Sequence, residues 1–116
     1  MPSKSPQHAY LIAGGSGMLG TALQRVLAER GASVTAPAEG SFDITDPVAV
    51  RHRVAEFVES LAPGQLGVLV NAAAYTNVER AEDQPEVAYQ VNEHGPVLLA
   101  RAAREAGLAF VHVSTD

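Results

Sequence analysis

A chain of 116 residues has room for one small domain that buries a real core. Apolar residues make up 47% of it and charged residues 18%, a balance that argues against a disordered chain. The net charge of −5 and the scattered arginines argue against a nucleic-acid partner, because that function needs clustered Lys and Arg.

The chain has no cysteine, which excludes disulfides, thiolate catalysis and Cys-based zinc sites. Its four histidines show no metal-ligand spacing, so we expect no metal site. Residues 1–8 are polar and lack the apolar stretch of a signal peptide, and no run reaches membrane-spanning length. We therefore expect a flexible tail over residues 1–8, a domain over residues 9–116, a cytoplasmic location and no membrane partner.

Short apolar runs alternate along the chain with stretches of helical period, which predicts parallel strands joined by crossover helices. The first helix should carry its apolar side chains on one face, namely Leu19, Ala22, Leu23, Val26 and Leu27. The expected strands are 9–13, 33–36, 66–71 and 109–113, and the expected helices are 18–30, one that begins at Asp46-Pro47, and one between Pro85 and Gly107 that Gly95-Pro96 interrupts.

A glycine trio, Gly14, Gly17 and Gly20, lies between the first strand and the first helix. Gly14 suits a tight turn, Gly17 admits the pyrophosphate of a dinucleotide, and Gly20 permits close helix packing. The helix N-terminus adds free N–H groups and partial positive charge. The pattern predicts the N-terminal portion of an α/β, Rossmann-type, doubly wound parallel sheet with about four strands. A glycine-rich turn without a ligand is the structural alternative.

Glu39 is the one acid near the expected end of the second strand, where NAD enzymes bind the ribose 2′-hydroxyl. It would repel the 2′-phosphate of NADP, and no arginine lies nearby in the sequence. An exposed glutamate in a turn beside Pro37 and Gly40 is the alternative interpretation, so the choice between NAD and NADP stays open.

Four stretches together resemble the dTDP-4-dehydrorhamnose reductases, a family within the extended short-chain dehydrogenases. The glycine spacing is common to the whole superfamily, whereas the long third stretch and its distance to the last one are more specific to these sugar-nucleotide reductases. The stretches are GGSGMLG at 14–20, FDITDP at 42–47, VNAAAYTNVERAEDQPEVAYQVN at 70–92 and VHVSTD at 111–116.

The resemblance implies that NADPH or NADH is the cofactor. It implies that an Asp-Ile pair contacts the adenine, although an Asp before a helix is often only a local turn former. It also implies that small residues after the third strand line the nicotinamide-side ribose, the alternative being simple packing. The implied cofactor-binding residues are Gly14, Gly17, Met18 and Leu19 for the pyrophosphate, Asp43 and Ile44 for the adenine, and Ala73, Ala74, Tyr75 and Thr76 for the ribose.

At the end of the fourth strand, Thr115 matches the family's catalytic threonine, which hydrogen-bonds the reacting oxygen of the substrate. Asp116 matches a neighbouring substrate-binding position. A strand terminus of this composition also suits a plain turn. We interpret His112, between two valines of that strand, as a satisfied core imidazole, and the acids over residues 79–86 as a solvated helix face.

The superfamily donates its proton from a tyrosine that a lysine four positions later makes more acidic. None of the tyrosines, at 10, 75 and 89, has such a lysine, and the one lysine is Lys4. We therefore expect the N-terminal portion of a sugar-nucleotide reductase, inactive alone, whose full-length form is a possible homodimer. The alternatives are a non-catalytic nucleotide-binding or regulatory module of the same fold and an inert, poorly folded product.

Overall fold

The computed structural model describes residues 7–38, 41–73 and 93–113. Within them the chain alternates strands and helices as its sequence predicts. Apart from the start of the last helix, the boundaries agree to within about a residue or two, the usual uncertainty of element ends. In chain order the elements are β1 (His8–Ala13), α1 (Met18–Glu29), β2 (Ser33–Thr35), α2 (Pro47–Ser60), β3 (Leu66–Asn71), α5 (Gly95–Ala106) and β4 (Ala109–His112).

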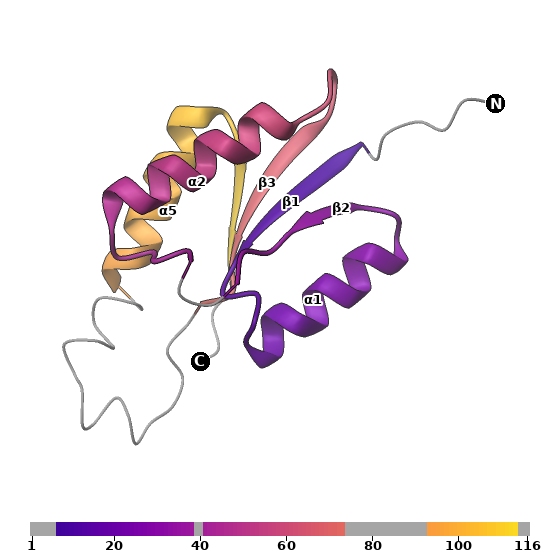
Figure 1. The fold of residues 1–116 in the computed structure, drawn as a ribbon, viewed down its shortest axis with the longest axis horizontal. Coiled ribbons are helices and arrows are strands. Elements are labelled where there is room, and N and C mark those ends of the chain that lie inside the picture. The colour runs from indigo at the N-terminus through magenta and orange to yellow at the C-terminus, as the bar shows by residue number, and fades with distance from the viewer. Residues whose placement is uncertain (1–6, 39–40, 74–92, 114–116) are drawn as a thin grey trace.

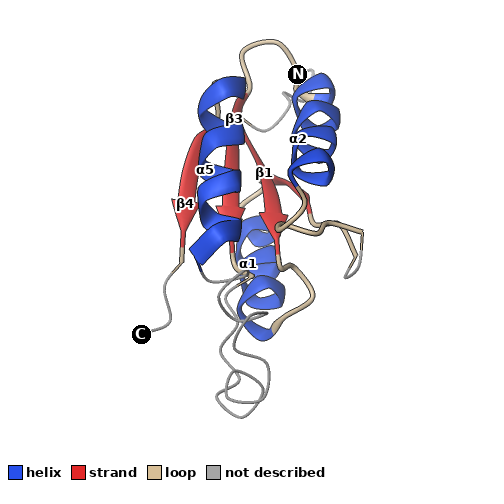
Figure 2. Ribbon diagram, turned by 90° about the vertical axis from the view of Figure 1, so that its left-hand side faces the viewer, coloured by secondary structure: helices blue, strands red, loops and turns tan. Residues whose placement is uncertain are grey.

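The four strands form one parallel sheet in the order β2-β1-β3-β4. Tyr10 pairs with Val34 on one side and with Val68 on the other, and Leu69 pairs with Phe110. All the strand arrows therefore point to the same edge of the sheet, as Figure 2 shows. The order reverses beside β1, which is the arrangement that places ligands at the carboxyl edge in doubly wound folds. The predicted Rossmann-type fold class is confirmed.

Helices cover both faces of the sheet, with α1 on one side and α2 and α5 on the other (Figure 1). Successive side chains along β1 and β3 therefore point to opposite faces of the sheet and belong to two separate apolar clusters. Leu11 and Leu69, both at most 1% exposed, belong to the cluster under α2 and α5, whereas Ile12 packs toward α1. This two-sided burial explains why the strands read as nearly continuous apolar runs.

The start of α2 follows from two adjacent residues. The Asp46 carboxylate accepts a hydrogen bond from the Val48 N–H at 3.0 Å, and Pro47 occupies the first turn, where a missing N–H costs nothing. Val50, Val54 and Phe57 then form the buried stripe of the helix. The sequence prediction for this helix is confirmed.

In α1 the expected apolar face is only partly buried. Leu23 and Leu27 pack onto the sheet, but the Val26 side chain is 44% exposed. A short β2 of three residues explains part of this, because it gives the last turns of the helix little sheet to cover. Val26, expected on the same apolar face as Leu23 and Leu27, is therefore an exposed member of that face.

The helix before β4 begins at Gly95, with Pro96 in its first turn. Residues 93–94, just before it, form a π-helical turn, which fits the loss of one backbone donor at the proline. The helix ends at Gly107, whose φ of 73° is the left-handed conformation that favours glycine. The part of the predicted helix from Pro85 to Asn92 lies outside the described residues.

No helix in the described ranges is long and apolar enough to cross a membrane.

Candidate dinucleotide site at the carboxyl edge

The loop between β1 and α1 lies at the carboxyl edge, directly beside the chain that leaves β3. Gly14 has a φ of 78°, and a Cβ built on it would stand 2.5 Å from Ala73 Cα. Both facts exclude a side chain, because the conformation is strained for other residues and the space is filled by backbone. The prediction that Gly14 permits the tight turn is confirmed, and the structure adds its contact with the end of β3.

Gly20 is buried in the first turns of α1 and faces the loop itself. A Cβ at this position would stand 2.2 Å from Gly14 O and 2.6 Å from Gly15 Cα. The helix therefore packs against its own leading loop, rather than only against the sheet as the sequence prediction had it. Gly14 and Gly20 are thus both explained by contacts within the chain.

Gly17 differs from the other two glycines of the trio. It is exposed, its φ is −75°, and a Cβ there would meet only Gly14 O, at an ordinary 3.6 Å. It is the N-cap of α1, yet no side chain caps the helix and no acid lies in its first turn. Met18, the next residue, is 92% exposed. The first amides of α1 and their positive dipole end therefore face open space, a geometry suited to an anion.

Two side chains of α1 fix the orientation of this loop. Gln24 Nε2 donates to Gly15 O at 2.8 Å, and Thr21 Oγ1 donates to the same oxygen at 3.3 Å. Gly17 N donates to Gly14 O at 3.3 Å, so both carbonyls are engaged inside the loop. An anion is repelled by carbonyl oxygens, and holding them inward leaves amide groups outward. Neither residue was predicted from the sequence; for Gln24, which is half-buried next to Leu23, a polar residue beside the apolar face of the helix was the available signal.

The Asp43-Ile44 pair precedes α2. Asp43 Oδ1 accepts from Thr45 N at 2.9 Å and from Thr45 Oγ1 at 2.6 Å, which is the local turn that the sequence left open as an alternative. The Asp43 side chain is exposed, whereas Ile44 is 5% exposed and belongs to the core cluster under α2. The exposed carboxylate of Asp43 is thus the group of this pair that a ligand can reach, whereas Ile44 is buried.

The chain leaving β3 is held on both sides. Ala72 N donates to Ala13 O at 2.8 Å, and Ala73 N donates to Asn71 Oδ1 at 3.0 Å. Asn71 is 1% exposed and its Nδ2 lies 3.0 Å from His112 Nδ1. Ala73, predicted to line the cofactor, is therefore placed against the glycine loop by a buried polar side chain that sequence analysis did not single out.

His112 has the predicted hydrogen bond but not the predicted burial. It is exposed, as is its neighbour Val111, at 46%. The reason is topological, because β4 is the last strand of the described sheet and only one of its edges is paired. The interpretation of His112 as a core imidazole was wrong, although the ring does have a hydrogen-bond partner, Asn71, which the sequence did not indicate.

Several predicted site residues lie outside the described part of the chain. They are Ala74, Tyr75 and Thr76 of the ribose segment, Thr115 and Asp116 at the substrate side, and Glu39 after β2.

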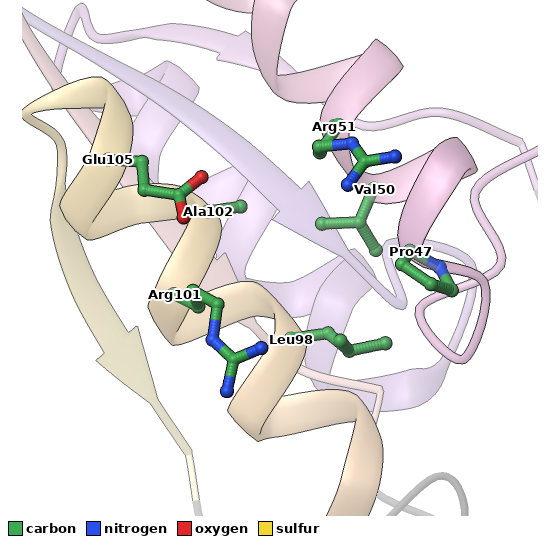
Figure 3. A pocket seen from close by; sticks show the side chains of 7 residues that line it. All are labelled: Pro47, Val50, Arg51, Leu98, Arg101, Ala102 and Glu105. Atoms are coloured by element: carbon green, nitrogen blue, oxygen red, sulfur yellow. The ribbon is translucent and has the colours of Figure 1, made fainter.

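Two hollows differ in size and position. The larger hollow, of about 470 Å³, is open to solvent; it begins at the glycine loop and follows α1 as far as Arg25. The other residues that line it are Ser16, Gly17, Met18, Thr21 and Ala22. The other, of about 70 Å³, lies between α2 and α5, with Val50, Leu98 and Ala102 at its floor (Figure 3). Ligand pockets usually exceed about 300 Å³, so of these two hollows, both formed by described residues, the one at the glycine loop has the size for part of a nucleotide. Asp43, Ile44 and Ala73 do not line it.

The parallel sheet, the reversal of strand order beside β1 and the uncapped helix after the glycine loop define a Rossmann-type α/β protein. The sequence model of the RmlD substrate binding domain matches residues 8–116. The chain belongs to this family.

Curated relatives agree with this assignment. The chain is 45% identical over 114 residues to a dTDP-4-dehydrorhamnose reductase of Streptomyces griseus, with 98% of the chain and 35% of the relative covered. It is 43% identical over 110 residues to a probable dTDP-4,6-dihydroxy-2-methyloxan-3-one 4-ketoreductase of Streptomyces antibioticus, covering 92% and 34%. The chain thus spans about a third of the length of these relatives.

A solved structure shares the fold over nearly the whole chain. The dTDP-4-dehydrorhamnose reductase of Bacillus anthracis, determined in complex with NADP, is similar with a TM-score of 0.79 and 26% identity, covering 97% of this chain and 38% of that one. The resemblance to this reductase family, expected from the sequence, is confirmed.

Proposed function

We propose that this chain binds the pyrophosphate of NADPH or NADH at its glycine loop. Gly17 carries the argument, because no contact within the described chain requires a glycine there. The uncapped N–H groups of Met18 and Leu19 lie where a phosphate oxygen would accept from them, while the Gly17 N–H is held by Gly14 O. Arg25, at the far end of the same hollow, adds positive charge.

The rest of the cofactor would extend along the carboxyl edge in both directions from this loop. Toward β2 and α2, the exposed carboxylate of Asp43 would accept from the exocyclic amine of the adenine, with Ile44 beside it. Toward β3, Ala73 lines the nicotinamide-side ribose together with Ala74, Tyr75 and Thr76. The contact between Gly14 and Ala73 supports this path, because it joins the pyrophosphate loop to the ribose segment.

The names of the relatives indicate the reaction of the full-length protein. We infer that it reduces a dTDP-linked 4-keto sugar, with dTDP-4-dehydrorhamnose as substrate and dTDP-rhamnose as product. A bound nicotinamide supplies the hydride. Thr115 hydrogen-bonds the reacting oxygen and Asp116 lies on the substrate side, whereas a Tyr-x-x-x-Lys pair, which this sequence lacks, donates the proton. The chain alone therefore binds cofactor without turnover.

The test compares two glycines at opposite ends of α1. Gly17→Ala should weaken NADPH binding about tenfold, because the new methyl group occupies the space of the pyrophosphate. Its φ of −75° and the ordinary 3.6 Å contact leave the fold intact, so the melting temperature should stay equal or rise. Isothermal titration calorimetry and thermal unfolding measure the two effects.

Gly31→Ala is the matched control. Gly31 has open space around it but a φ of 79°, so alanine there should lower stability by about 1 kcal/mol and leave the dissociation constant unchanged. No binding of NADPH or NADH by the wild-type chain, or equal affinity of the Gly17→Ala variant, would contradict the proposal.

A further inference from the structure

Asn71 connects two strand ends at the carboxyl edge. It is 1% exposed, at the end of β3, and its side chain makes one bond to the backbone of its own loop and one to β4. Val113 N also donates to Asn71 O at 3.1 Å, which keeps the two strands paired beyond His112. The side chain is therefore fixed at both of its polar atoms.

The protonation state of His112 follows from this geometry by elimination. The backbone N–H of Ala73 can only donate, so the Asn71 atom that faces it is the oxygen. The amide nitrogen of Asn71 then faces His112 and must donate, which requires a lone pair on Nδ1. The observed arrangement thus needs a neutral imidazole with its proton on Nε2.

A second proton on His112 would remove that lone pair. The Nδ1–H group would then face the Asn71 NH₂ group, and two donors cannot bond. The conflict ends in one of two ways: the imidazole leaves its partner, or the Asn71 amide rotates by half a turn. Rotation places NH₂ against the Ala73 N–H, so the loop after β3 loses the bond that holds it.

No nearby carboxylate replaces the lost hydrogen bond by pairing with a charged His112, as far as the described residues go. β3 carries no titratable side chain, and α5 with the turn before it carries Glu93, His94, Arg101, Arg104 and Glu105. Within the described ranges none of these groups lies within ion-pair distance of the imidazole. His112 itself is exposed.

We propose that His112 is a positioning residue, which acts through Asn71 to keep the Ala72–Ala73 backbone in its cofactor-binding conformation only while the imidazole is neutral. The inference rests on the proposed function for its ligand, since Ala73 borders the glycine loop at the expected ribose. Cofactor affinity then falls as the pH drops through the range in which histidine gains charge.

The first experiment needs no cofactor. Nuclear magnetic resonance of the wild-type chain from about pH 8 to about pH 5.5 should show the Ala73 amide and the Asn71 side-chain amide moving together with the His112 ring signals. His112→Gln supplies an acceptor that does not titrate, so these movements should vanish. His52→Gln is the control, because His52 is exposed on α2 and pairs with Glu56 at 3.3 Å, far along the chain from this network.

The second experiment measures NADPH affinity over the same range. For the wild-type chain and the His52→Gln variant, NADPH binding should be about fivefold weaker at about pH 5.5 than at about pH 8, after subtraction of any change that His112→Gln shows. A change of about fivefold corresponds to the loss of one hydrogen bond. A purely structural role of His112 would change the melting temperature without this difference in pH profile.

The two experiments fail separately. Absence of NADPH binding at every pH would refute the proposed function, and the amide titration would still test the link between His112, Asn71 and Ala73. Ala73 and Asn71 signals that do not follow His112, or that move equally in His112→Gln, would overturn the inference, as would identical pH profiles of affinity for wild type and His112→Gln.

Discussion

The loop after β1 and the loop after β3 meet at the carboxyl edge, but they are held in place by opposite means. The first relies on missing side chains, since Gly14 and Gly20 let backbone meet backbone. The second relies on one buried polar side chain, Asn71, which bonds to Ala73 and to His112. The candidate dinucleotide site thus combines backbone contacts that leave no room for a side chain, at Gly14 and Gly20, with hydrogen bonds that need the side-chain amide of Asn71.

The largest effect is expected at Gly20. Gly20→Ala places a methyl group 2.2 Å from Gly14 O, where only backbone can move, so the free energy of unfolding should fall by about 3 kcal/mol. Urea unfolding followed by circular dichroism measures this. A loss as small as that of an exposed helix substitution would show that the loop is not tightly packed.

A smaller loss is expected from the second loop. Asn71→Leu keeps a similar volume but leaves the Ala73 N–H without its acceptor, which should cost about 2 kcal/mol. Hydrogen exchange at the Ala73 amide, just after β3, should accelerate more than at Val70, within β3. Equal acceleration at both amides would mean that the substitution loosens β3 as a whole.

The smallest effect is expected at Gln24. Gln24→Met removes the 2.8 Å bond to Gly15 O while Thr21 still donates to it, so stability should fall by about 1 kcal/mol or less. NADPH affinity should fall as well, because the Gly15 carbonyl, then held only by the longer bond from Thr21, can turn toward the phosphates. Glu29→Gln, on the exposed end of the same helix, is the control; matching affinities for the two variants would remove Gln24 from the site.

Local chemistry made much of this fold predictable. The glycine spacing, the Asp46-Pro47 start of α2 and the apolar run of β3 each act through neighbours in the sequence. The position of β4 as an outermost strand of the described sheet depends on the order of the strands and not on neighbours in the sequence. The exposure of His112 therefore could not be predicted from its two flanking valines. The bond between Asn71 and His112 joins residues 41 positions apart, and only the register of β3 and β4 brings them together.

Mapping of backbone amide shifts during a titration with NADPH tests the central claim most directly. The account predicts the largest shifts at Gly17, Met18 and Leu19, followed by Ala73. Shifts confined to the α2–α5 groove around Leu98 and Ala102, or no shifts at millimolar NADPH, would contradict it.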